Sequence, residues 1–143
     1  MVKELKKNYF TLLAPAGVGF ALVCCARFFN VAPLGGWQPP KALAAGVFIL
    51  SAVCALAAPI YLRTLFAHKM RGRKQVARVD LIGLERTIIR LAGATPYLGL
   101  LAYALGFPQF YFTATMLMMF YALYYHFPSQ RRIDFDRRIF RVS

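Results

Sequence analysis

The sequence predicts an all-α integral membrane protein whose four transmembrane helices form two antiparallel hairpins. Four long apolar runs fill most of the 143 residues, and nearly all of the positive charge in a chain of net charge +13 lies outside them. Peptide groups inside a bilayer find no water to bond, so apolar runs of roughly 18 residues settle there as helices. A soluble chain with 59% hydrophobic residues would also expose too much apolar surface to stay monomeric.

The first hairpin begins at the N-terminus. Its first apolar run covers residues 9–29 and follows Lys3, Lys6 and Lys7, and because no small-residue cleavage site follows it, we expect an uncleaved span. A turn rich in Pro and Gly over residues 30–40 cannot continue the helix, and the second run then covers residues 42–66.

The second hairpin is tighter than the first. Its apolar runs cover residues 91–107 and 110–127, and the short turn around Gly106 to Gln109 makes antiparallel neighbours of these two spans. We expect residues 1–143 to form a single transmembrane domain.

The connection between the second and third spans, residues 68–90, is basic and has its own pattern. Val76, Val79, Ile82 and Ile89 recur near helical spacing, and Leu81 and Leu84 broaden the apolar side. This pattern predicts an amphipathic helix lying in the headgroup region. The alternative is an ordinary basic loop attracted to anionic lipid.

The tail, residues 128–143, alternates arginines with Ile and Phe. Segments rich in Lys and Arg near span ends remain on the cytoplasmic side, whereas the turns at 30–40 and 106–109 carry almost no charge. The sequence therefore predicts a bacterial inner-membrane protein with both termini and the central connection in the cytoplasm.

The basic residues of these segments are the predicted contacts for anionic lipid or for an acidic protein partner. Because they flank spans instead of lining one soluble domain, nucleic acid is not an expected ligand. The predicted contact residues are Arg63, Lys74, Arg78, Arg86, Arg90, Arg131, Arg132, Arg137 and Arg138.

Two histidines suggest a cofactor-binding alternative. His68 follows the second span and His126 ends the fourth, so both imidazoles are expected at a similar depth, where they could ligate a haem iron axially. Interfacial histidines without a cofactor are the competing interpretation. The sequence contains no recognisable metal-ligand motif, phosphate loop or nucleophile elbow.

These observations predict a non-enzymatic protein with no required cofactor. The leading hypothesis is an accessory or assembly subunit of a larger bacterial membrane complex, which would bind other subunits or further copies of itself. The alternative is a small homo-oligomeric transporter or flippase-like protein for an anionic lipid or solute, with Arg63 and Arg90 contacting the headgroup. The span interiors hold no acidic side chain, which argues against a proton-coupled carrier. A haem-binding electron carrier is the third hypothesis.

Overall fold

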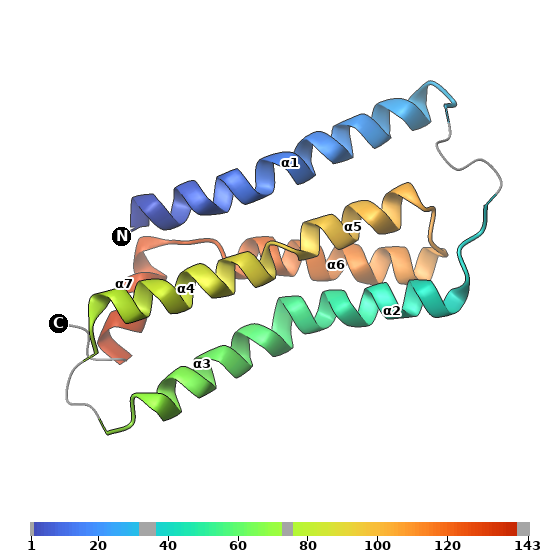
Figure 1. Cartoon of the computed structure of the whole chain (residues 1–143). Helices are drawn as coiled ribbons and strands as arrows, with labels where there is room; N and C mark the ends of the chain where they lie inside the picture. The colour runs from blue at the N-terminus through green and yellow to red at the C-terminus, as the bar shows by residue number, and fades with distance from the viewer. Residues whose placement is uncertain (1, 32–36, 73–75, 140–143) are drawn as a thin grey trace.

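The computed structural model describes residues 2–31, 37–72 and 76–139, and every regular element in these segments is a helix (Figure 1). The all-helical prediction is therefore confirmed. In chain order the elements are α1 (Val2–Phe28), α2 (Lys41–Ala52), a π-helical turn (Val53–Ala57), α3 (Ala58–Lys69), α4 (Arg78–Ala92), α5 (Thr95–Ala104), α6 (Gln109–Tyr125) and α7 (Gln130–Ile139).

Two helical segments are long and apolar enough to cross a membrane. They are α1, with 27 residues, and the continuous segment Lys41–Lys69, with 29 residues. Helix α5 has 10 residues and α6 has 17, so length and composition single out only the first two predicted spans.

The π-helical turn in the second long segment has a local cause. The N–H of Ala58 donates to the carbonyl of Val53, five residues back, and the next residue is Pro59, which has no N–H to donate. Widening the helix by one residue before a proline relieves the clash of its ring with the preceding turn. The helix continues through Pro59 as α3.

Helices α4 and α5 follow one another with a short break at Gly93 and Ala94 (Figure 1). Pro96 sits in the first turn of α5, where its missing N–H is tolerated, although it cannot donate to the carbonyl of Ala92. The predicted third span, residues 91–107, therefore begins inside one helix and continues in the next.

The order of packing differs from two compact hairpins. Helices α5 and α6 pack against each other at the centre, α1 packs against α4 and α5, and α2 packs against α5 and α6. Helices α1 and α2 thus lie on opposite sides of the central pair (Figure 1). In the second predicted hairpin the two spans, α5 and α6, pack against each other. In the first, α1 and α2 are separated by the helices of the second hairpin.

Two clusters of buried side chains join these helices. The turn cluster (Ala44, Val47, Ala102 and Phe107) joins α2, α5 and the turn before α6, and the alanine cluster (Ala55, Ala92 and Ala122) joins the π-helical turn, α4 and α6. Small side chains in both clusters let the helices approach closely.

Helix α1 buries little of its surface and is attached by a few specific contacts. The Tyr9 hydroxyl donates to the carbonyl of Leu123 at 2.9 Å. Near the other end, Arg27 Nη2 donates to the carbonyl of Tyr103 at 2.6 Å, and its guanidinium lies 4.6 Å from the centre of that ring. Between them, the side chain of Leu12 lies against Gly93 at the break between α4 and α5.

The basic connection and the tail both contain packed helices. In α4, Leu81, Leu84 and Ile88 pack against Leu62 and Phe66 of α3. The predicted amphipathic helix is present as α4, and most of its predicted apolar side is buried, including Leu81, Leu84 and Ile89, whereas Val79 is 78% exposed. Since α4 runs along α3 and leads into α5, it extends the bundle lengthwise (Figure 1).

Helix α7 was not predicted. Its Ile133 joins Leu5 and Tyr9 of α1 and Ile89 of α4 in one buried cluster. The tail thus folds back against both of these helices, at the end of the bundle that also carries residue Val2 (Figure 1). We refer to it as the α7 end.

Candidate functional site: a buried ion cluster beside an aromatic groove

Four charged side chains meet at the α7 end and form what we call the ion cluster: Arg63, Glu85, Arg132 and Asp136. Arg63 Nη2 of α3 lies 3.0 Å from Glu85 Oε1 of α4 and 2.9 Å from Asp136 Oδ2 of α7. Arg132 Nη2 of α7 lies 3.4 Å from Glu85 Oε2. One guanidinium thus bridges two carboxylates, and one carboxylate bridges two guanidiniums.

The carboxylates of this cluster are buried more deeply than the arginines. Glu85 and Asp136 are 3% and 2% exposed, whereas the side chains of Arg63 and Arg132 keep 28% and 16% of their surface. Burial raises the pKa of Glu85 above its ordinary value and outweighs Arg132 and Arg63, which lower it, while the neighbouring Asp136 carboxyl adds to the rise. The two positive and two negative charges balance.

His126 is buried next to the cluster, directly after α6. Its imidazole is 1% exposed and its Nδ1 lies 3.2 Å from the carbonyl oxygen of Ala122. The ring of Tyr125 stands nearly perpendicular to it, with centroids 5.3 Å apart.

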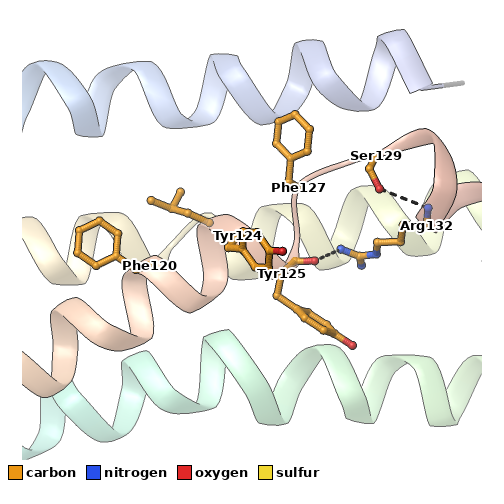
Figure 2. A pocket seen from close by; sticks show the side chains of 7 residues that line it. Phe120, Tyr124, Tyr125, Phe127, Ser129 and Arg132 are labelled. Atoms are coloured by element: carbon orange, nitrogen blue, oxygen red, sulfur yellow. Dashed lines mark hydrogen bonds between the residues drawn. The ribbon is translucent and has the colours of Figure 1, made fainter.

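An open groove with a volume of about 700 Å³ lies beside the ion cluster and shares Arg132 with it (Figure 2). The walls are mostly aromatic and come from the end of α6, the following turn and the start of α7. The lining residues are Phe120, Leu123, Tyr124, Tyr125, Phe127, Ser129 and Arg132.

Arg132 is fixed from several directions. Its Nη1 donates to the carbonyl of Tyr125 at 2.6 Å, and its backbone N–H donates to the Ser129 hydroxyl at 3.3 Å (Figure 2). The guanidinium also lies 5.6 Å from the centre of the Tyr125 ring. A second cation borders the groove, because Lys6 Nζ of α1 lies 5.5 Å from the centre of the Phe127 ring. The groove therefore combines aromatic walls with two positive charges and one hydroxyl.

The predicted basic contact residues fall into two groups. The structure brings Arg63 and Arg132 together through Glu85, and it leaves Arg78, Arg90, Arg131, Arg137 and Arg138 exposed. Arg86 is half-buried, and its Nε is a buried donor with no hydrogen-bond partner among the described residues. Lys74 lies outside the described residues.

The two predicted haem ligands stand in unlike surroundings. His68 is exposed on the last turn of α3, and His126 is buried against Ala122 and Tyr125. No contact described in these segments joins the two imidazoles. Within the same residues, no group of three or more His, Cys, Asp or Glu side chains is arranged to hold a metal ion.

Glu85 and Asp136 are the members of the site that sequence reasoning missed. Neither was singled out as a site residue, because both lie outside the predicted spans. A signal was available for each: Glu85 shares a helical face with Leu81 and Ile88, and Asp136 stands one turn beyond Ile133.

Comparisons of this chain with protein-family models, with curated proteins and with solved structures found no match. The site must therefore be interpreted from its own geometry.

Proposed function

We propose that the protein is a four-span, non-enzymatic inner-membrane protein whose α7 end faces the cytoplasm and binds an anionic phospholipid in the aromatic groove. In this proposal it serves as an accessory or assembly subunit of a larger membrane complex. The observation that carries the proposal is the groove itself, with Lys6 and Arg132 at the margin of aromatic walls.

The spacing of cations along the long helices supports a bilayer of ordinary thickness. Lys7 and Arg27 stand about 30 Å apart along α1, and Lys41 and Arg63 about 33 Å apart along the second long segment, from the 1.5 Å rise per residue. The hydrocarbon core of a bilayer is about 30 Å thick. Each pair therefore suits the two headgroup regions, with Lys7 and Arg63 on the same side.

The third and fourth spans would be α5 with the end of α4, and α6. Helix α6 is about 26 Å long at 1.5 Å per residue, slightly less than the hydrocarbon thickness. A short span is tolerated where flanking side chains reach outward or the bilayer thins locally. Exposed aromatic residues at the end of α6, among them Tyr124, suit the headgroup level.

The chemistry of the groove matches a phospholipid better than a free anion. The rings of Phe120 and Phe127 offer apolar surface to an acyl chain. The phosphate would lie toward Lys6 and Ser129, because the Arg132 guanidinium is already engaged by Glu85 and the Tyr125 carbonyl. Juxtamembrane cations gain on the order of 1 kcal/mol each near anionic lipid.

The transporter alternative receives less support. It assigned Arg63 and Arg90 to one headgroup site, but Arg63 is bound to two buried carboxylates and Arg90 is exposed on α4. A guanidinium neutralised in this way would have to leave its partners before it could contact a substrate.

Lipid retention tests the groove. The protein would be released from nanodiscs of phosphatidylglycerol or of phosphatidylcholine and examined by native mass spectrometry. We expect phosphatidylglycerol adducts to persist in the wild type and to decrease severalfold in Lys6→Gln. Lys41→Gln removes a cation from the opposite end and should retain the lipid. Equal retention of both lipids, or no response to Lys6→Gln, would contradict the groove assignment.

The role as a subunit needs a separate test. Purification in gentle detergent from native expression levels, followed by mass spectrometry, should recover further membrane proteins at constant ratio. Recovery of only a monomer or homodimer would contradict an accessory role. Lipid binding in the groove is tested separately, by the retention experiment.

A further inference from the structure

A second open groove lies between α3 and α4, which pack side by side, and has a volume of about 300 Å³ (Figure 1). We call it the α3–α4 groove. Its apolar lining includes Leu62, Phe66 and Leu84, which belong to the cluster that holds the two helices together. It shares no lining residue with the aromatic groove, so it is a separate feature of the surface.

One end of the α3–α4 groove carries two opposite charges that do not pair with each other. Lys69 lies in the last turn of α3 and Asp80 in the first turn of α4, and both line the groove. Within the described segments neither side chain forms an ion pair or a hydrogen bond, whereas both carboxylates of the ion cluster are bound to arginines. Each charge suits the dipole of its own helix end, but both remain available to a charged partner.

The wall that α4 contributes to the groove is narrow and uncovered. Val79 is 78% exposed, and a Cβ added to Gly83 would meet nothing within 4 Å. Thr87 follows one turn later, and its hydroxyl already donates to the carbonyl of Gly83 at 2.9 Å. These three residues are spaced four apart and therefore lie on one face of α4. Small side chains with satisfied polar groups form a strip that a second helix can approach closely.

The length of the groove favours a protein occupant over a lipid. Lys69 lies seven residues from Leu62 in α3, and Asp80 lies seven residues from Thr87 in α4, which is about 10 Å along each helix. Because the proposed topology places Arg63 at the headgroup level, the charged end lies about 10 Å farther into the cytoplasm. The headgroup layer is only roughly 5–8 Å thick on each side.

A second copy of this chain offers the charges that Lys69 and Asp80 need. Two copies inserted in one membrane share their orientation, so a twofold axis along the membrane normal keeps every residue at its own depth. Lys69 and Asp80 lie at the same end of the groove, and each can therefore face the opposite charge of the partner. The contact forms twice, as a self-complementary interface requires.

From these observations we infer that the α3–α4 groove is the interface of a homodimer. The α4 strips of the two copies face each other, and Lys69 of each copy pairs with Asp80 of the other. The dimer goes beyond the lipid site and the accessory role proposed above, and it rests only on the proposed insertion in a membrane.

Charge reversal in separate copies tests the pairing. Wild-type and variant chains would carry a donor or an acceptor dye on a C-terminal tag and would be reconstituted in vesicles at a high lipid-to-protein ratio. Lys69→Asp alone places two acidic groups together, and Asp80→Lys alone places two lysines together, so energy transfer should fall severalfold in each. A mixture of the two variants restores both opposite-charge pairs between copies and should recover the transfer of the wild type. Asp134→Lys, in α7 and outside the groove, should associate like the wild type.

Filling the groove gives a second test that does not depend on charge. Gly83→Leu places a large side chain on the α4 strip, where the chain itself leaves open space. It should preserve or raise the thermal stability, because leucine favours a helix more than glycine does, and yet abolish energy transfer. Gly46→Leu, at a glycine of α2 with equally open surroundings, should keep the transfer.

Several results would overturn the homodimer. Absence of energy transfer between wild-type copies that have inserted in the vesicles would do so without any variant. A mixture of Lys69→Asp and Asp80→Lys that transfers no better than either variant alone would exclude the reciprocal pairs. Unchanged transfer in Gly83→Leu would place the interface elsewhere. Failure of the chain to insert in vesicles at all would contradict the membrane proposal, and the dimer with it.

Discussion

Arg63 and Asp136 are 73 residues apart in the sequence, yet Arg63 Nη2 and Asp136 Oδ2 lie 2.9 Å apart. This contact joins the predicted second span to a tail that was expected only to bind lipid or a partner from outside. Because the same guanidinium also holds Glu85, one side chain of α3 positions both α4 and α7. The aromatic groove, whose wall includes Arg132, depends on that arrangement.

Removing one carboxylate of the ion cluster should release α7. Asp136→Ala leaves the Arg63 guanidinium with one partner, and breaking a buried ion pair in this way costs on the order of 3 kcal/mol. We expect lower resistance to denaturant and faster tryptic cleavage at Arg137 and Arg138. The matched control is Asp134→Ala, in the same helix but less buried. Equal effects of the two substitutions would contradict a structural role for the cluster.

The stability of the protein should carry a pH dependence that belongs to Glu85. Its pKa in the folded chain is raised above the ordinary 4.5, mainly by burial. As the pH rises from 4.5 toward the raised value, the unfolded chain releases the proton while the folded chain retains it, so Glu85 contributes a loss of stability.

Denaturation midpoints of the wild type and Glu85→Gln, measured from pH 4 upward in one non-ionic detergent, check this sign. Because Gln does not titrate, the variant should not lose stability in this way. The denaturation midpoint of the wild type minus that of the variant should therefore decrease as the pH rises. A difference that is constant with pH, or that shifts in the opposite direction, would be inconsistent with the raised pKa.

A methyl group at Gly93 should push α1 away from the rest of the bundle. The added Cβ of Gly93→Ala would meet the side chain of Leu12 and would stand 2.8 Å from the carbonyl oxygen of Ile89. Overpacking of this kind costs about 1–3 kcal/mol. Gly17→Ala provides the control, because nothing lies within 4 Å of its added Cβ. We expect the control to match or slightly exceed the wild type in thermal unfolding, while Gly93→Ala falls below both.

The orientation in the membrane can be tested with reporter fusions. Alkaline phosphatase fused after Ser143 should be inactive, because the proposed topology places the C-terminus in the cytoplasm, where its disulfides do not form. The same enzyme fused after Trp37, in the turn between α1 and α2, should be active. Activity of the first fusion would exclude an even number of spans with a cytoplasmic N-terminus.

Helical periodicity and apolar length predicted much of the secondary structure, because both are local properties of the chain. They placed the long segment Lys41–Lys69 and α6 close to their observed bounds. The end of α1 was also close, but this helix begins at Val2, seven residues before the predicted run of 9–29. They also predicted a helix in the basic connection, in which Ile89 is buried as expected but Val79 is exposed. Leu81, Leu84 and Ile88 are buried because α3 covers that side, and the sequence of α4 alone cannot identify its neighbour.

The candidate site was harder to predict than the helices. The arginines were identified, but their partners Glu85 and Asp136 come from segments far apart in the chain, and only the folding of α7 against α1 and α4 brings them together. A tail of alternating charge and apolar residues was interpreted as a surface for external partners. Its apolar Ile133 instead packs inside the protein, which is the step that buries Asp136.

The position of α5 and α6 between α1 and α2 constrains how the chain assembles during synthesis (Figure 1). The ribosome makes α1 and α2 first, yet the surfaces that these helices bury belong to α4, α5 and α6, which are made later. Until α4, α5 and α6 have been synthesised, the faces of α1 and α2 that contact them remain without these partners. A nascent chain that stops before α6 therefore holds two helices without the core that joins them, and the bundle is completed only by the last third of the polypeptide.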